Sequence, residues 1–135
     1  MKRFLFPILL LTFLFSACEK ENLPPADAVQ VKFINKTGAD IEGLVVTPAK
    51  PGLLEKGKTT GDYFRFEKLG QQFGYALVDA VGTIDGKRFY TAAACQGECG
   101  TASAPAGEWL ENGYYKISIH IAKNEPNSLE FRMQE

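Results

Sequence analysis

Hydrophobic and polar residues alternate along most of the chain after residue 28. In residues 29–35, Val29, Val31 and Phe33 share one face, and Gln30 and Lys32 lie on the other. A period of two residues is typical of a half-buried β-strand. Similar patterns predict strands over residues 41–47, 61–66, 73–84, 87–94, 114–121 and 129–133. No segment keeps a helical apolar period over a helical length, so we expect an all-β domain.

Turn signals separate these strands. Asp85-Gly86 predicts a tight hairpin, because a type I′ turn needs positive φ at both central positions. The polar residues 35–40 predict a second hairpin, between strands 29–35 and 41–47. Residues 48–52 predict a loop and residues 53–60 a bend. About seven strands with frequent turns are typical of a β-sandwich.

The first eighteen residues have the order of a secretory signal. Lys2-Arg3 is basic, residues 4–15 are apolar but too short for a permanent membrane span, and Ser16-Ala17 is small. Cys18 follows directly, so the segment resembles the lipobox of bacterial lipoproteins, although Phe15 stands where leucine is usual. The resemblance implies that Cys18 is acylated and becomes the first mature residue. The alternative is an ordinary signal with a chance cysteine.

The chain is then expected to have three parts: a signal peptide (1–17), a lipidated tether (18–28) and a β-sandwich domain (29–135). Pro24 and Pro25 favour an extended tether. Lys20-Glu21 is similar to an export signal of some surface lipoproteins, and it equally fits a solvated charged tether.

A second resemblance concerns the strand that begins near residue 114. Leu110-x-x-Gly113-x-Tyr115 is similar to the tyrosine corner, in which a tyrosine hydroxyl bonds back to the backbone. Together with the lipobox, it resembles the small lipoproteins of Gram-negative envelopes. That resemblance implies an immunoglobulin-like or prealbumin-like β-sandwich and an outer-membrane location. It leaves open whether the domain faces the periplasm or the cell surface.

Charge excludes some partners. Loss of the signal removes Lys2 and Arg3 and no acidic residue, so the net charge of −1 becomes about −3. A mildly acidic chain argues against nucleic acid as a partner. Membrane contact is expected through acylated Cys18 instead.

Two cysteines remain after Cys18. Cys95 and Cys99 are expected to form a disulfide in an exported, oxidising compartment. Their spacing is not that of a Cys-x-x-Cys redox site, and with His120 they supply too few ligands for zinc. We therefore expect neither a metal nor a cofactor.

The chain offers little for catalysis. His120 lies beside Ser118 on the polar face of a predicted strand, and no Gly-x-Ser-x-Gly motif accompanies them. Acidic pairs such as Asp79 and Asp85, or Glu108 and Glu111, could be considered for glycoside hydrolysis, but solvated charge is their ordinary interpretation.

The segment from Cys95 to Trp109 is the candidate binding loop. It is long for a loop in a small domain, and it carries Gln96, Glu98 and the only tryptophan. The alternative is that Trp109 packs on the core. We expect a lipid-anchored, non-catalytic binding or structural module that contacts a protein or glycan. The main alternative is a hydrolase inhibitor that uses the disulfide-stiffened loop, because rigid loops lose less entropy on binding.

Overall fold

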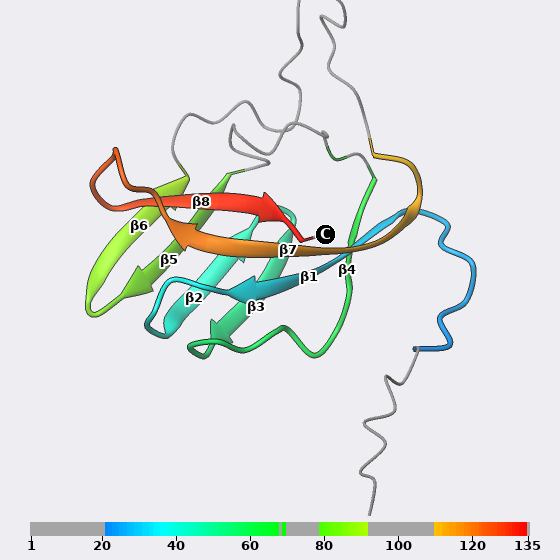
Figure 1. Cartoon of the computed structure of the whole chain (residues 1–135), viewed down its shortest axis with the longest axis horizontal. Helices are drawn as coiled ribbons and strands as arrows, with labels where there is room; N and C mark the ends of the chain where they lie inside the picture. Colours follow the sequence, from blue (N-terminus) through cyan, green and yellow to red (C-terminus); the bar gives the residue numbers. More distant parts are fainter. Residues whose placement is uncertain (1–20, 68, 70–78, 92–109, 135) are drawn as a thin grey trace, which may run out of the picture.

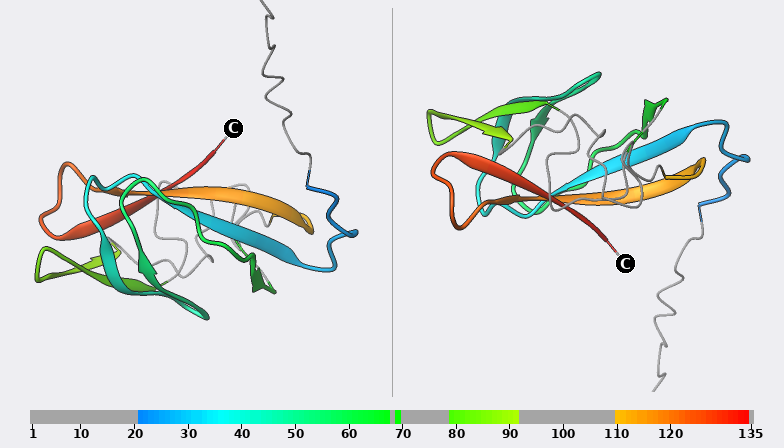
Figure 2. Two further views of the ribbon diagram at one scale, coloured as in Figure 1. Left: turned by 90° about the horizontal axis from the view of Figure 1, so that it is seen from below. Right: turned by 90° about the horizontal axis from the view of Figure 1, so that it is seen from above.

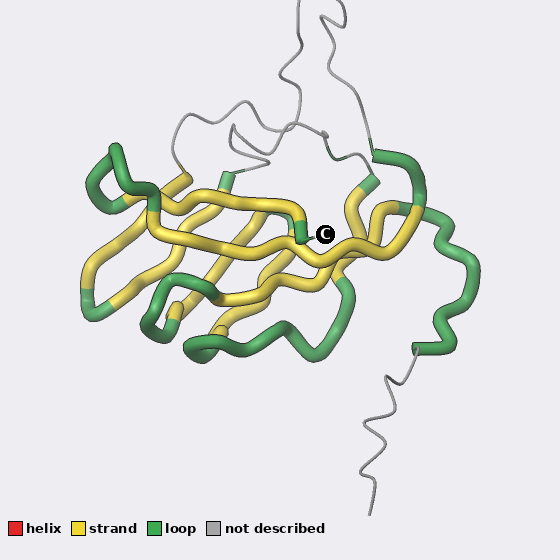
Figure 3. Tube along the Cα trace, in the orientation of Figure 1, coloured by secondary structure: helices red, strands yellow, loops and turns green. Residues whose placement is uncertain are grey.

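Eight strands dominate the part of the chain that the computed structural model describes, which is residues 21–67, 69, 79–91 and 110–134 (Figure 1). They are β1 (Val29–Asn35), β2 (Ile41–Val46), β3 (Ala49–Leu54), β4 (Phe64–Phe66), β5 (Ala80–Ile84), β6 (Lys87–Thr91), β7 (Gly113–Ile121) and β8 (Ser128–Met133). Among these residues only strands, loops and turns occur, with no helix (Figure 3). The all-β fold class is therefore confirmed.

The strands form one mixed sheet that curls until its two edges approach each other. Its order is β3-β2-β5-β6-β8-β7-β1-β4, with parallel pairing only between β1 and β7 and between β6 and β8 among the described strands. The edge strands β3 and β4 are in contact. The strands β8, β7 and β1 pass in front of β6, β5, β2 and β3, and views along the other axis separate these two layers (Figure 2). The sheet thus closes nearly into a barrel.

The core lies between the two layers. Strand β1 alternates strictly, with every second side chain buried, as the sequence pattern predicts. The ring of Phe33 packs edge-on against those of Phe66 and Phe131, with centroids 6.3 and 6.4 Å apart. The largest fully buried side chains are Phe33, Phe66, Phe131, Ile41, Leu44, Leu69, Ile117, Ile119, Leu129, Val29, Val31 and Val46. They come from both layers, so neither layer has a core without the other.

Two local predictions from the sequence are confirmed in detail. Asp85 and Gly86 have φ of 49° and 75° and join β5 to β6, as expected for a type I′ hairpin. The Tyr115 hydroxyl donates a 2.8 Å hydrogen bond to the carbonyl oxygen of Glu111, which is the tyrosine-corner contact. A Cβ on Gly113 would lie 3.3 Å from the Tyr115 ring, so the glycine leaves room for that ring.

The predicted hairpin between residues 29–35 and 41–47 is wrong. Strand β1 pairs with β7 and β4, whereas β2 pairs with β3 and β5 in the other layer. Residues 36–40 therefore cross between layers. The buried side chain of Asn35 fixes this crossing, because its Nδ2 donates to the carbonyl oxygens of Ala39 and Leu54 at 2.8 and 2.7 Å.

The loop predicted over residues 48–52 is also wrong, because most of it belongs to β3. Pro51 and Gly52 interrupt the alternating pattern, and Gly52 has a φ of 76°. Such residues are tolerated in β3 because it is an edge strand, in which an N–H on the free side is not needed for a hydrogen bond to a neighbouring strand. The following segment then runs along β1, where Thr60 N donates to the Phe33 carbonyl oxygen at 2.9 Å.

Candidate functional site

The site residues predicted from the sequence lie outside the described part of the chain. These are the lipidation site Cys18, the expected disulfide Cys95–Cys99, and Gln96, Glu98 and Trp109 of the candidate binding loop. Their roles stay predictions. The described residues contain a groove that is close to this loop in the sequence, because β6 ends at Thr91, four residues before Cys95.

The groove lies at one end of the β5–β6 hairpin and has a volume of about 340 Å³. That volume is at the lower end of the range for small-molecule sites, roughly 300–1,000 Å³. The lining residues come from β5, β6 and the two segments that precede β5 and follow β2; they are Thr47, Asp79, Ala80, Val81, Arg88, Tyr90 and Thr91. A backbone hydrogen bond of 2.9 Å from Thr47 N to the Asp79 carbonyl oxygen joins those two segments.

Tyr90 is the most conspicuous side chain of the groove. Its neighbour Phe89 points into the core at 8% exposure, so the alternation of β6 turns Tyr90 outward, where it is 53% exposed. The guanidinium carbon of Arg88 lies 5.8 Å from the centroid of the Tyr90 ring. This distance is within the range of about 6 Å for a cation–π contact, which orients the ring.

The groove has the chemistry of a recognition site for a flat polar group. An exposed aromatic face stacks on a sugar ring or on a side chain, and a guanidinium beside it supplies several fixed hydrogen-bond donors. The alternating pattern of residues 87–94 puts Arg88 and Tyr90 on one face of their strand, but it shows neither that this face is the outward one nor which other segments join them. The signal that was overlooked is a large aromatic residue on the polar face of a strand.

A second groove of about 330 Å³ follows the seam where the sheet does not fully close. It is lined by parts of β3 and β4 and by the segment that joins them. Leu53 stands at its rim and is 61% exposed. The accessible lining of this groove is mostly polar. Its described lining residues include no arginine, so it lacks the pairing of an exposed aromatic ring with a guanidinium that the first groove has.

Ser118 and His120 do come together, but they form a structural cluster. Ser118 Oγ lies 2.9 Å from His120 Nε2, donates to the Arg132 carbonyl oxygen at 3.2 Å and accepts from Gln134 Nε2 at 2.7 Å. The Ser118 side chain is fully buried, which corrects its predicted place on an open polar face. With its proton directed to the carbonyl and no exposure, this hydroxyl is not available to a substrate.

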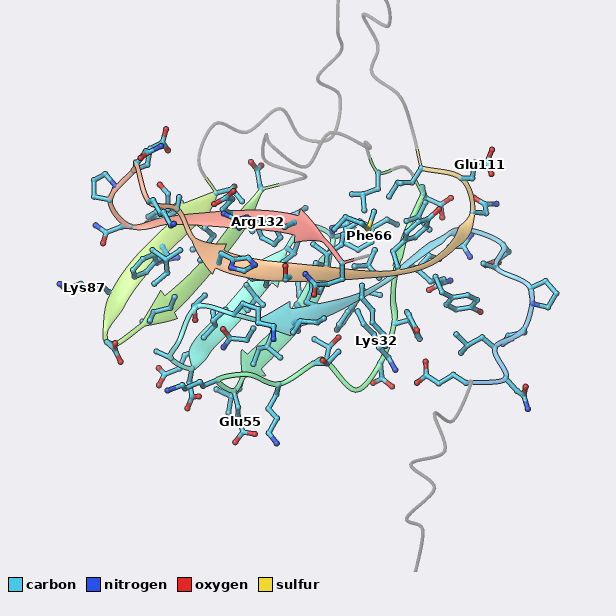
Figure 4. All side chains as sticks on the ribbon, in the orientation of Figure 1. Lys32, Glu55, Phe66, Lys87, Glu111 and Arg132 are labelled. Carbon is cyan, nitrogen blue, oxygen red and sulfur yellow. The ribbon has the colours of Figure 1, made fainter. Side chains whose placement is uncertain are left out.

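The surroundings of His120 also disfavour acid–base catalysis. Burial and the positive charge of Arg132 lower the pKa of His120 below its ordinary value, so the ring is neutral at pH 7. The acidic residue opposite it, Glu130, is paired through both carboxylate oxygens with the Arg132 guanidinium at 3.0 Å (Arg132 is labelled in Figure 4). That carboxylate is committed to the arginine rather than to orienting the histidine.

Asp79 and Asp85, one of the two carboxylate pairs considered for glycoside hydrolysis, do not come together. Asp79 precedes β5 and Asp85 follows it, so they lie at opposite ends of this strand. Six residues of extended strand span about 20 Å. Glycosidase carboxylates are at most about 9.5 Å apart. Glu108, the partner considered for Glu111, lies outside the described residues.

Comparison with known proteins adds no relative. No protein-family model matches this chain, and no curated protein or solved structure is significantly similar to it. Within the described ranges, no group of three or more His, Cys, Asp or Glu side chains is placed to hold a metal ion. No helix among those residues is long and apolar enough to cross a membrane.

Proposed function

We propose that the chain is a lipid-anchored lipoprotein of a Gram-negative outer membrane whose β-domain is a non-catalytic binding module for a protein or glycan. The basic, apolar and small-residue order of residues 1–18 supports the anchor at Cys18. For the domain, the proposed subtype is an immunoglobulin-like or prealbumin-like sandwich. The two packed layers and the tyrosine-corner bond of Tyr115 are consistent with it.

The observation that carries the binding role is the groove of Tyr90 and Arg88. A half-exposed tyrosine beside a guanidinium places a stacking face and fixed hydrogen-bond donors together on one surface. The predicted loop 95–109 begins four residues after β6 in the sequence, and we propose that it adds to the same binding face. We propose that the ligand is a glycan, or a protein side chain, that stacks on this ring.

Binding can be tested on the mature protein with a glycan array and with envelope or host protein extracts. Tyr90→Ala should weaken binding of any captured ligand by at least about thirtyfold, because loss of a central aromatic contact costs about 2 kcal/mol or more. Tyr90→Phe should retain most of the affinity, since the ring is kept. Leu53→Ala, which truncates an exposed side chain at the other groove, is the matched control.

A ligand that binds Tyr90→Ala as tightly as the wild type would exclude this groove as the site. If that ligand is a hydrolase and reduction of the Cys95–Cys99 bond abolishes its inhibition, the inhibitor hypothesis is the better one. The expected disulfide closes a small ring in the segment after β6, so its reduction should leave the described sheet folded.

A further inference from the structure

Residues 21–27, here called the strap, lie against the domain although they are rich in proline and mostly exposed. The carboxylate of Glu21 makes two contacts with the sheet: Oε1 lies 2.8 Å from Lys32 Nζ, and Oε2 accepts a 3.0 Å hydrogen bond from the Tyr63 hydroxyl. Lys32 projects from β1 and its side chain is only 13% exposed (Figure 4). The first described residue of the chain is thus bound to the fold.

The surface that receives the strap is built from adjacent parts of the sheet. The Tyr114 hydroxyl, from β7, donates to the Pro24 carbonyl oxygen at 2.9 Å. The rings of Tyr63 and Tyr114 pack edge-on with centroids 4.9 Å apart, and Lys32 Nζ lies 4.5 Å from the Tyr63 centroid. We call Lys32, Tyr63 and Tyr114 the platform. Its three side chains support one another and present one cation and two hydroxyl donors to the strap.

The other end of the strap is fixed as well. Asp27 Oδ2 lies 2.7 Å from Arg65 Nη1 of β4, and the Ala28 carbonyl oxygen accepts from Gly113 N at 3.1 Å. The hydrogen bonds from Lys32 and Tyr63 lower the pKa of Glu21, so its carboxylate is ionised above the acid range and the contact persists at neutral pH. Contacts at both ends and in the middle leave no free loop between residues 21 and 28.

We propose that the strap bound to this platform holds the β4–β1–β7 face of the domain close to the bilayer, instead of serving as a free leash. This inference rests on the proposed acylation of Cys18. A free tether from Cys18 to Ala28 would reach about 35 Å, but the three steps from Cys18 to bound Glu21 reach only about 10 Å. The β5–β6 hairpin lies at the opposite end of the domain from the strap in both views (Figure 2). The hairpin that lines the groove is thereby placed at the end of the domain away from the strap.

Two measurements on the full mature lipoprotein test the inference. The first is the rate at which a glutamate-specific protease cuts after Glu21 in detergent, which does not depend on lipidation. The bound strap should be cut slowly in the wild type and several-fold faster in Lys32→Met/Tyr114→Phe, which removes the ion pair with Glu21 and the hydrogen bond to Pro24 but leaves the cleaved residue unchanged. Lys32→Met keeps an unbranched side chain and Tyr114→Phe keeps its ring, so the domain should stay folded. Tyr90→Phe is the matched control and should be cut at the wild-type rate.

The second measurement is the hydrated gap between a supported bilayer and the protein layer, by neutron reflectometry. The wild type should show a gap of at most about 10 Å, and the double variant a wider one. Cleavage of the wild type and the double variant at equal rates, or a wide gap in the wild type, would overturn the proposal that the bound strap holds the domain close to the bilayer. If the mature chain carries no acyl group at Cys18, the proposed function is wrong, but the cleavage assay still shows whether the strap is bound to the platform.

Discussion

The substitution Asn35→Asp tests the crossing between the two layers with almost no change of shape. Asn35 is fully buried at the end of β1. Its Nδ2 donates to two carbonyl oxygens, of Ala39 and Leu54, and its Oδ1 accepts from the backbone N and the hydroxyl of Thr37 at 3.0 and 2.7 Å. Aspartate keeps the acceptor and replaces the double donor by a second oxygen that faces both carbonyls.

The expected loss follows from those contacts. The Thr37 hydroxyl has one proton and lies within reach of both Asn35 Oδ1 and the Ala39 carbonyl oxygen, at 2.7 and 2.9 Å. When that proton turns to Ala39 it satisfies that carbonyl, so most of the cost falls on the Leu54 carbonyl and on the buried carboxylate itself. Each buried polar group left without a partner costs about 1–3 kcal/mol, and more if it is charged, so we expect about 2–4 kcal/mol at pH 7.5. That is a large part of the stability of a small domain, about 5–15 kcal/mol.

The defect should depend on pH with a definite sign. Burial and the two carbonyl oxygens raise the folded pKa of the new carboxyl above its unfolded value of about 3.9, and the protonated form can donate one of the lost hydrogen bonds. Stability contributed by that proton is present below the unfolded pKa and lost as pH rises through the folded pKa. The variant should therefore be closer to wild type at pH 4.5 than at pH 7.5.

Urea unfolding followed by far-ultraviolet circular dichroism measures both effects against the wild type at each pH. Asn112→Asp, at an exposed position, is the matched control and should change the free energy of unfolding by less than about 0.5 kcal/mol. If Asn35→Asp costs no more than this control, or costs the same at both pH values, Asn35 does not hold the crossing as described.

Two further substitutions test the packing. Gly82→Ala should lower the free energy of unfolding by about 1–3 kcal/mol in the same assay, because the new Cβ would lie 2.5 Å from Ile41 Cγ2 in the core. Gly61→Ala is the control and should be near neutral, because nothing lies within 4 Å of its new Cβ. Equal effects of the two substitutions would refute the close contact at Gly82. Tyr115→Phe should cost about 0.5–1.5 kcal/mol through loss of the hydroxyl bond to Glu111, and an unchanged free energy of unfolding would show that this bond contributes nothing.

Local patterns in the sequence predicted local structure well. The alternation of residues 29–35 and the positive-φ pair Asp85-Gly86 each require only neighbouring residues, and both are confirmed. The bond from Tyr115 to Glu111 is similarly local. Each of these features is decided within a few residues, so the sequence contains the whole signal.

Pairing between distant segments could not be predicted in this way. A polar turn after Asn35 is compatible with a hairpin or with a crossing, and only the position of Leu54, nineteen residues later, decides between them. The burial of Ser118 depends on Gln134, sixteen residues away, which covers and bonds its hydroxyl. The groove at Tyr90 was missed for the same reason, because Thr47 joins it from the segment that follows β2.

The anchor is the claim on which the location and the function of the domain both depend. Its most direct test is the intact mass of the protein extracted from the membranes of its own cells. We predict a chain that begins at Cys18 and carries more than one acyl group, since a single chain holds a protein only marginally at about 0.8 kcal/mol per buried methylene. A chain that still begins at Met1, or one that carries an unmodified Cys18, would contradict the proposal.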